Sequence, residues 1–247
     1  QDPLSVARTL ATPGFETGTD RAWPPVSSAG YTLPDALRRF IGTEFTPGWI
    51  ALYSSLMSTI ARFEDSPGDF EASAECSDLI DRARALSAAR AARMGNRPDA
   101  SIILPAFNNL LYTLTAVVSV LETAGSSTFE IIVADDASTD ATEEVVARLG
   151  GVGRLKRAAF NAGFLNNCNA AAKEARGRIF VFLNNDVIVM PNWLDMLIAP
   201  LSDTGVGLSG SRLLGSDGRL QEAGGVFWSD GSASNFGRDA DATLPEY

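Results

Sequence analysis

The chain has 247 residues, a formal net charge of −10 and a sequence pI of about 4.5. Such an acidic composition excludes nucleic acid or an anionic membrane as the main partner, because both require a basic surface. No apolar run approaches the roughly 20 residues of a membrane span, and the first residues lack the pattern of a signal peptide. We therefore expect a cytoplasmic protein, with peripheral attachment to the inner face of the membrane left open.

The chain contains no histidine, and Cys76 and Cys168 are its only cysteines. This composition excludes Ser-His-Asp and Cys-His catalysis as well as imidazole metal ligands. Two cysteines form neither a disulfide framework nor a zinc site, so we interpret them as reduced thiols. Acid–base chemistry must then come from carboxylates, lysine, tyrosine or the substrate.

The first 98 residues are predicted to be an irregular leader followed by a helical extension. Residues 1–30 are rich in Pro, Gly, Ser and Thr, which is typical of an irregular segment. Apolar spacing predicts helices at 32–40, 47–63 and 70–94, the last interrupted near Cys76. No chemical motif occurs here, so we expect a role in docking or in oligomer contacts.

From residue 99 onward, strand and helix patterns alternate, which predicts an α/β domain over 99–247 with a mostly parallel sheet flanked by helices. The predicted strands are 101–108, 130–136, an edge strand at 154–158, 179–183, 206–214 and 219–228. The predicted helices are 110–123, 139–149 with Thr139 as its cap, 161–175, and one that begins near Pro191. Asp217 and Gly218 form the turn between the last two strands.

Three predicted strands end on polar side chains, namely Asn108, Asp136 and Asp186. The run 179–183 is continuously apolar, which predicts a strand buried on both faces. Because the carboxyl ends of parallel strands meet at one edge, where ligands bind in open α/β sheets, we expect the three side chains to lie together. Such oxygen donors suit a hard divalent cation and a hydroxyl-rich ligand. The alternative is a set of turns and helix caps around residues 135–140 and 184–186.

Other residues near these ends allow two interpretations. Asn161 and Gly163 can let the backbone approach a ligand, or they can simply mark the entry to a helix. Trp193 and Trp228 are typical core residues, with sugar stacking by Trp228 as the alternative. The glycines at 150–153 follow a helix rather than a strand, which excludes a dinucleotide-binding loop.

Six motifs together resemble family 2 glycosyltransferases of the GT-A fold, and especially the rhamnosyltransferase-like branch that builds bacterial surface polysaccharides. They cover about the last three-fifths of the chain, and their order is more specific than any single motif. In chain order they are Pro-Ala-Phe-Asn at 105–108, Val-Ala-Asp-Asp-Ala-Ser-Thr-Asp at 133–140, Asn-Ala-Gly-Phe at 161–164 with Asn-Cys-Asn at 167–169, Phe-Leu-Asn-Asn-Asp at 182–186, Pro-Asn-Trp-Leu at 191–194 and Asp-Gly-Arg-Leu-Gln-Glu-Ala-Gly-Gly at 217–225.

The resemblance implies an inverting hexosyltransferase that uses a dTDP- or UDP-sugar, a glycan or lipid-linked acceptor, and Mn²⁺ or Mg²⁺. Asp186 is then the metal ligand, and Asp136 contacts the base or ribose. The full set of nucleotide-sugar-binding residues implied is Pro105, Phe107, Asn108, Asp136, Asn161, Gly163, Asn185 and Asp186. The family's acidic Asp-X-Asp element has asparagine at its earlier positions here.

The resemblance also implies a catalytic base downstream of the segment 217–225. We expect that base beyond Tyr247, which would make 99–247 incomplete on its acceptor side. Glu222 and Asp230 are the candidates within the chain.

Two other functions remain open. A non-catalytic carbohydrate- or nucleotide-binding module has the same fold without transfer activity. A sugar nucleotidyltransferase shares a similar sheet, but it needs a glycine-rich basic loop after the first strand, and residues 108–112 contain neither glycine nor a basic residue.

Overall fold

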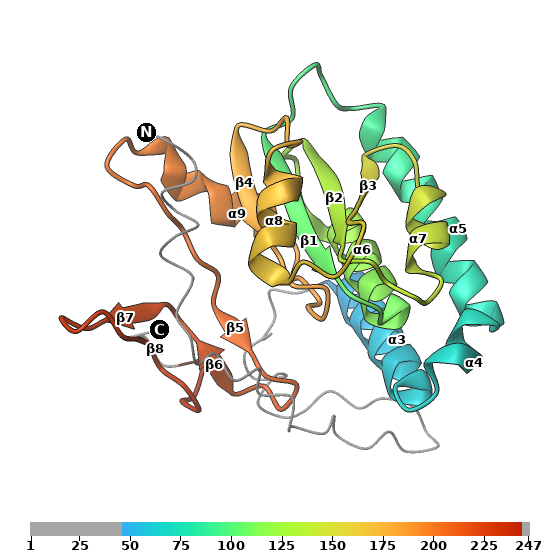
Figure 1. Cartoon of the computed structure of the whole chain (residues 1–247). Helices are drawn as coiled ribbons and strands as arrows, with labels where there is room; N and C mark the ends of the chain where they lie inside the picture. Colours follow the sequence, from blue (N-terminus) through green and yellow to red (C-terminus); the bar gives the residue numbers. More distant parts are fainter. Residues whose placement is uncertain (1–45, 244–247) are drawn as a thin grey trace. The chain divides into compact units, whose positions relative to one another are not determined.

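The computed structural model describes residues 46–243, so the predicted leader and the predicted helix at 32–40 lie outside the described residues. The described residues fall into two compact units, one of residues 62–195 and one of residues 46–61 with 196–243 (Figure 1). The first unit contains the parallel sheet and the predicted strand ends, and each unit is described by itself.

The sheet of the first unit has four parallel strands. They are β1 (Ala100–Ala106), β2 (Phe129–Asp135), β3 (Gly153–Arg157) and β4 (Ile179–Phe182), in the order β3-β2-β1-β4. The pairing of β1 with β2 extends from Ala100 opposite Phe129 to Ala106 opposite Asp135 without a register shift. Both strands are mostly apolar and buried. This arrangement confirms the predicted α/β class and brings the carboxyl ends of β1 and β2 together.

Helices cover both faces of the sheet (Figure 1). On one face, α8 (Phe164–Ala172) packs Ala171 against buried side chains of β1 and β2, which are Ile103, Ile132 and Ala134. On the other face, α6 (Leu110–Thr123) is buried along almost its whole length, because it lies between the sheet and α5 (Ala74–Ala91). Helix α7 (Thr142–Ala147) packs beside β3.

The predicted helix 70–94 is interrupted, as expected, and forms α4 (Pro67–Glu71) and α5. The Ser73 hydroxyl caps α5 by accepting a hydrogen bond from the backbone N–H of Cys76 at 3.1 Å. Arg90, in the last turn of α5, donates to the carbonyl oxygens of Leu121 and Gly125 at 3.0 and 2.8 Å. These bonds fix α5 to the C-terminal end of α6.

The second unit contributes short antiparallel pairs. β5 (Leu213–Leu214) pairs with β6 (Leu220–Glu222), and β7 (Gly225–Phe227) pairs with β8 (Ala233–Asn235). Helix α3 (Pro47–Phe63), most of which belongs to this unit, has the predicted bounds.

Helix α9 (Trp193–Ile198) and a 3₁₀ turn (Ala199–Ser202) connect the two parts of the chain. None of the helices in residues 46–243 is long and apolar enough to cross a membrane.

Three sequence predictions are wrong in detail. β4 is not buried on both faces: Phe180 and Phe182 are 39 % and 44 % exposed, because β4 is the last strand of the described sheet and pairs only with β1. The predicted strand pair 206–214 and 219–228 is also wrong. Only Leu213 and Leu214 of the first segment pair with another strand, and the second segment is divided between β6 and β7, which belong to different sheets.

The third error concerns α7, which begins at Thr142 rather than at Thr139. Thr139 does not cap it, because its hydroxyl and its N–H both lie against the Asn108 side-chain oxygen, at 3.3 and 2.8 Å. The first N–H of α7, on Thr142, instead donates to the Asp140 carboxylate at 3.1 Å.

The amino end of β2 is organised around the Asp195 carboxylate. It accepts hydrogen bonds from the N–H and hydroxyl of both Ser126 and Ser127, the two N–H donors each at 2.8 Å. A side chain at Gly125, where φ is +82°, would lie 2.5 Å from this carboxylate. Burial alone would raise the pKa of Asp195, but these hydrogen bonds outweigh it and lower the pKa to about 2.

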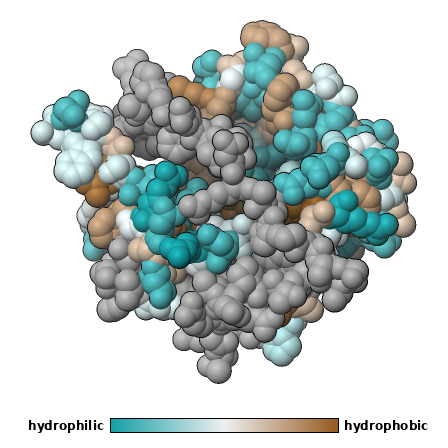
Figure 2. Space-filling model, turned by 90° about the horizontal axis from the view of Figure 1, so that it is seen from below, coloured by the Kyte–Doolittle hydropathy of each residue, from teal (hydrophilic) through white to brown (hydrophobic). Residues whose placement is uncertain are grey.

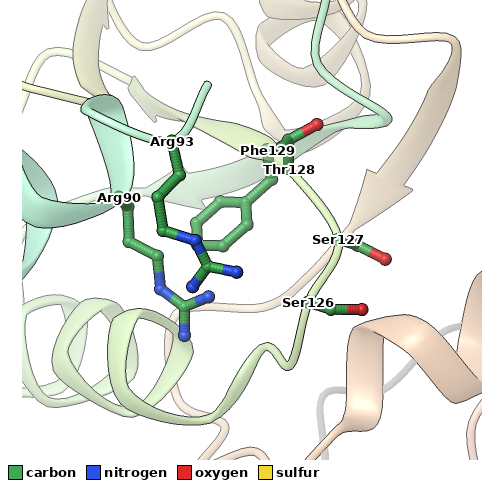
Figure 3. Close-up of a pocket in the computed structure, with 6 residues that line it drawn as sticks. All are labelled: Arg90, Arg93, Ser126, Ser127, Thr128 and Phe129. Carbon is green, nitrogen blue, oxygen red and sulfur yellow. The ribbon is translucent and has the colours of Figure 1, made fainter. Parts of the chain in front are cut away.

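A shallow hollow lies beside this segment, lined by Arg90, Arg93 and residues 126–129 (Figure 3). It is at the amino end of β2, whereas Asp136 follows the carboxyl end of the same strand. The hollow is therefore not the predicted ligand edge. On the face seen in Figure 2, the coloured residues mix hydrophilic and hydrophobic side chains.

We predict that Asp195→Asn lowers the free energy of unfolding by about 1 kcal/mol at pH 6. The substitution replaces one accepting oxygen with an NH₂ group, so the donors of one serine lose their acceptor. The folded pKa is depressed, so this stability is present above the unfolded pKa near 3.8 and is lost as the pH falls toward about 2. Urea unfolding of both proteins between pH 2.5 and 6 measures the difference. A difference that stays constant over this range would contradict the assignment.

Candidate functional site

The turns that follow β1 and β2 are joined by several hydrogen bonds. The Asp136 N–H donates to the Ala106 carbonyl at 2.8 Å, and the Asn108 N–H donates to the Ser138 hydroxyl at 2.7 Å. The Thr139 N–H donates to the Asn108 side-chain oxygen at 2.8 Å. Asn108 has a φ of +58°, which asparagine tolerates better than most residues. The structure thus brings Asn108 and Asp136 together, and the Asn108 oxygen positions the neighbouring turn.

The adjacent aspartates have different surroundings. Asp135 is fully buried, forms an ion pair with Arg157, and accepts a hydrogen bond from the Ser138 N–H at 2.9 Å. Arg157 also donates to the Ser138 carbonyl at 2.9 Å. Asp135 therefore stabilises the turn from within the fold.

Asp136 holds the segment that leads into α8. One carboxylate oxygen accepts from the Ala162 N–H at 2.7 Å and the other from the Gly163 N–H at 2.9 Å. Gly163 has a φ of +81°, which favours glycine, and its N–H also lies 3.2 Å from the Asn161 side-chain oxygen. The structure thus groups Asp136, Asn161 and Gly163. Among the described residues two amides bond to this carboxylate, which leaves two of its roughly four acceptor positions for other donors.

Of the three polar residues after β4, Asn185 is bonded to a neighbouring helix, whereas Asn184 and Asp186 are exposed. The Asn185 side-chain NH₂ donates to the hydroxyl of Thr113, a buried residue in the first turn of α6, at 3.0 Å. The Leu183 N–H bonds to the Ile103 carbonyl at 3.0 Å, so this turn starts beside β1.

The donor atoms after β4 suit one kind of metal site. Within residues 46–243, no three acidic, cysteine or histidine side chains gather as a metal-binding group. One exposed carboxylate and neighbouring amide oxygens do not form an all-protein cage. They do fit Mg²⁺ or Mn²⁺, which is commonly held by one or two carboxylates while waters and substrate phosphates complete the shell.

Exposed aromatic residues occur in the sequence beside the groups that bond to Asn108 and Asp136. Phe107 is exposed next to Asn108, and Pro105 is partly buried within β1. Sequence reasoning missed Phe160 and Phe164, which are 72 % and 58 % exposed. In the sequence they flank Ala162 and Gly163, whose amides bind Asp136, so their position beside the Asn-Ala-Gly segment was the available signal. Exposed aromatic rings at a ligand edge can stack on planar or apolar groups.

Cys168 lies within α8, behind this edge. It is buried, and burial together with the Asp136 charge raises the pKa of its thiol to about 11. Such a thiol is unreactive at neutral pH. Cys76 is also free and buried.

The two candidate bases belong to the other compact unit. Glu222 is the last residue of β6. Asp230 lies in the turn between β7 and β8, where one of its oxygens accepts from the Ser232 hydroxyl and N–H at 2.7 and 2.9 Å. These bonds lower the pKa of Asp230. Trp228, which was interpreted as a core residue with sugar stacking as the alternative, is exposed, so the core interpretation is wrong.

We predict that Asp135→Asn costs about 2–3 kcal/mol of unfolding free energy, because it leaves the half-buried Arg157 without its buried partner. Glu143→Gln is the matched control, since Glu143 is the exposed partner of the same arginine at 3.2 Å. That variant should cost less than about 0.5 kcal/mol. Equal losses in urea unfolding would show that the buried aspartate has no special role.

The family model for Glycosyl transferase family 2 matches residues 101–231 of the chain. The uncharacterized protein y4gI of Sinorhizobium fredii is 36 % identical over 149 residues, which cover 58 % of the chain and 16 % of that protein. The O-antigen biosynthesis protein RfbC of Myxococcus xanthus is 33 % identical over 143 residues, which cover 56 % and 11 %. The chain thus spans less than a fifth of the length of these relatives.

Solved structures show weaker similarity. The mannosyltransferase PcManGT of Pyrobaculum calidifontis, in complex with GDP-Man and Mn²⁺, has 23 % identity and a TM-score of 0.36 over 46 % of the chain and 41 % of its own. S. aureus TarS 1–349, in complex with UDP-GlcNAc, has 23 % identity and a TM-score of 0.40 over 47 % and 37 %.

Proposed function

The chain belongs to glycosyl transferase family 2, and from that premise we propose that residues 99–247 bind a nucleotide-diphosphate sugar for an inverting, metal-dependent hexosyl transfer. The parallel sheet with helices on both faces agrees with the GT-A-type class predicted from the sequence. The observation that carries the proposal is the buried Asp136 carboxylate at the junction of the turns after β1 and β2 and the segment before α8.

Asp136 supplies acceptor positions for the hydroxyls of a ribose or an N–H of a pyrimidine. Within the described residues it has no arginine or lysine partner, and its negative charge is shared only with main-chain amides. The exposed rings of Phe107, Phe160 and Phe164 are available to the base or ribose. Asn161 and Gly163 are proposed to contribute to the same nucleotide site, together with Pro105 and Asn108 from the turn beside it.

Asp186 is the residue proposed to hold the cation. A bound Mn²⁺ or Mg²⁺ would neutralise charge on the departing nucleotide diphosphate. Asp186 is exposed at the end of β4 and lacks an ion-pair partner in the described part of the chain, so its charge is available. The hydrogen bond of Asn185 to Thr113 is proposed to hold the turn and so to orient Asp186.

The acceptor is proposed to be a glycan or lipid-linked hydroxyl in bacterial surface polysaccharide synthesis, with a rhamnosyltransferase-like enzyme as the finer assignment. The name of the RfbC relative refers to O-antigen biosynthesis and supports this class of product. Such a reaction takes place on the cytoplasmic side, where dTDP- and UDP-sugars are the proposed donors. Within the chain, Glu222 is the better candidate base, because the lowered pKa and turn contacts of Asp230 make that carboxylate a weaker base.

A non-catalytic nucleotide-binding module is the second candidate. The observation that favours it is the lone acidic side chain after β4, since no group of three metal-binding side chains occurs within residues 46–243. Both candidates require nucleotide binding, and they differ in whether sugar is transferred.

We predict that Mn²⁺ increases the affinity for UDP or dTDP. Asp186→Asn should reduce this Mn²⁺-dependent gain in affinity at least about tenfold, or by about 1.4 kcal/mol. Asp203→Asn is the matched control, since Asp203 is also an exposed loop carboxylate. It should leave the Mn²⁺ effect unchanged. Isothermal titration calorimetry with and without Mn²⁺ measures both, and negligible binding of either nucleotide by the wild type would refute the proposed function.

A further inference from the structure

The first turn of α6 receives bonds from two of the loops at the ligand edge. Neither α6 nor α7 has a side-chain cap from its own N-cap residue, which is Asn109 for α6 and Ala141 for α7. Asp140 replaces both caps. One of its oxygens accepts from the Leu110 N–H at 3.0 Å, and the other accepts from the Thr142 N–H at 3.1 Å.

A carboxylate shared between two helix starts is a strong link. The first N–H groups of a helix have no partner within the helix and carry partial positive charge, so an anion there satisfies donors and gains electrostatic energy. Asp140 therefore fixes the β1–α6 turn, including the consecutive left-handed residues Asn108 and Asn109, against the β2–α7 turn.

Within this first turn of α6, Thr113 anchors the loop that follows β4. Its N–H bonds to the Asn109 carbonyl at 3.1 Å, so it belongs to the same helical turn. Its buried hydroxyl accepts the Asn185 NH₂ at 3.0 Å. The loop that presents Asp186 is thus attached to the helical turn that Asp140 fixes from the other side.

We propose that the first turn of α6 is a shared anchor for the donor site, with Asp140 positioning the nucleoside end and Thr113 positioning the metal end. Neither residue touches the ligand in this scheme. The proposal rests on the proposed function for its ligand, but the two bonds of Asp140 and the bond of Thr113 can be tested without it.

The two residues predict different binding phenotypes. Asp140→Asn places an NH₂ against one helix N–H, so the turn around Asn108 and Asp136 loosens, and the Kd for UDP should rise roughly tenfold with or without Mn²⁺. Thr113→Val keeps the shape but removes the acceptor of the Asn185 NH₂. It should leave the metal-free Kd within about twofold and reduce the Mn²⁺-dependent gain roughly fivefold, as expected for the loss of one hydrogen bond.

Ser73→Ala is the matched control, because Ser73 caps α5 through one hydrogen bond to Cys76 and is not part of the site turns. It should lower stability by a similar amount and leave both Kd values unchanged. If Ser73→Ala weakens UDP binding as much as Asp140→Asn, the effect is one of stability and the positioning role is wrong. If Asp140→Asn and Thr113→Val give the same pattern with and without Mn²⁺, the division into two ends is wrong.

Amide hydrogen exchange separates this inference from the proposed function. Asp140→Asn should speed exchange at Leu110 or Thr142, and Thr113→Val should speed exchange of the Asn185 side-chain NH₂, whether or not nucleotide binds. Absence of nucleotide binding by the wild type would refute the proposed function. Unchanged exchange in both variants would refute the anchor.

Discussion

The candidate site depends on carboxylates that accept hydrogen bonds from main-chain amides. The turns after parallel strands have no sheet partner for their N–H groups, and buried N–H groups without acceptors are costly. Asp136 accepts from the segment before α8, and Asp140 accepts from the starts of α6 and α7. Asp136 thus fixes one loop segment to the turn after β2, and Asp140 fixes two helix starts to each other.

Arginine neutralises buried carboxylates at both edges of the sheet. At the amino end, burial would raise the pKa of Glu130, but hydrogen bonds from Ser101 and Arg176 and the charge of Arg154 keep it lowered. At the carboxyl end, the buried Asp135 is paired with Arg157. Asp136 and Asp186 differ from both, because neither has an arginine or lysine partner among the described residues. In the proposed function, these two carboxylates are therefore the ones left for the ligand.

Helix and strand positions were largely predictable because apolar spacing records burial. The bounds of α3 and α6 agree with the sequence prediction for this reason. The exposure of β4 was not predictable, since its apolar run does not reveal that it ends the described sheet. The roles of Asp135 and Asp136 were also hidden: consecutive side chains leave a strand in opposite directions, and only the structure shows which one meets Arg157. The sequence allowed Asp140 to be interpreted as the cap of the helix that follows it, but it did not reveal that Asp140 also caps α6.

Asn185, directly before Asp186, is bonded to a buried residue of α6, whereas Asp186 itself is exposed. A carboxylate at position 185 would add a second negative charge beside Asp186 and would lack the NH₂ that binds Thr113. Compared with a carboxylate at this position, the Asn185 amide offers no negative charge to a cation, but it forms a hydrogen bond to the buried first turn of α6. A single carboxylate on a loop fixed in this way can still serve a cation whose remaining ligands are phosphate oxygens and water, because Mg²⁺ and Mn²⁺ need few protein ligands when a diphosphate is present. In the proposed function, the position of Asp186, rather than the number of acidic residues around it, would set where the diphosphate lies.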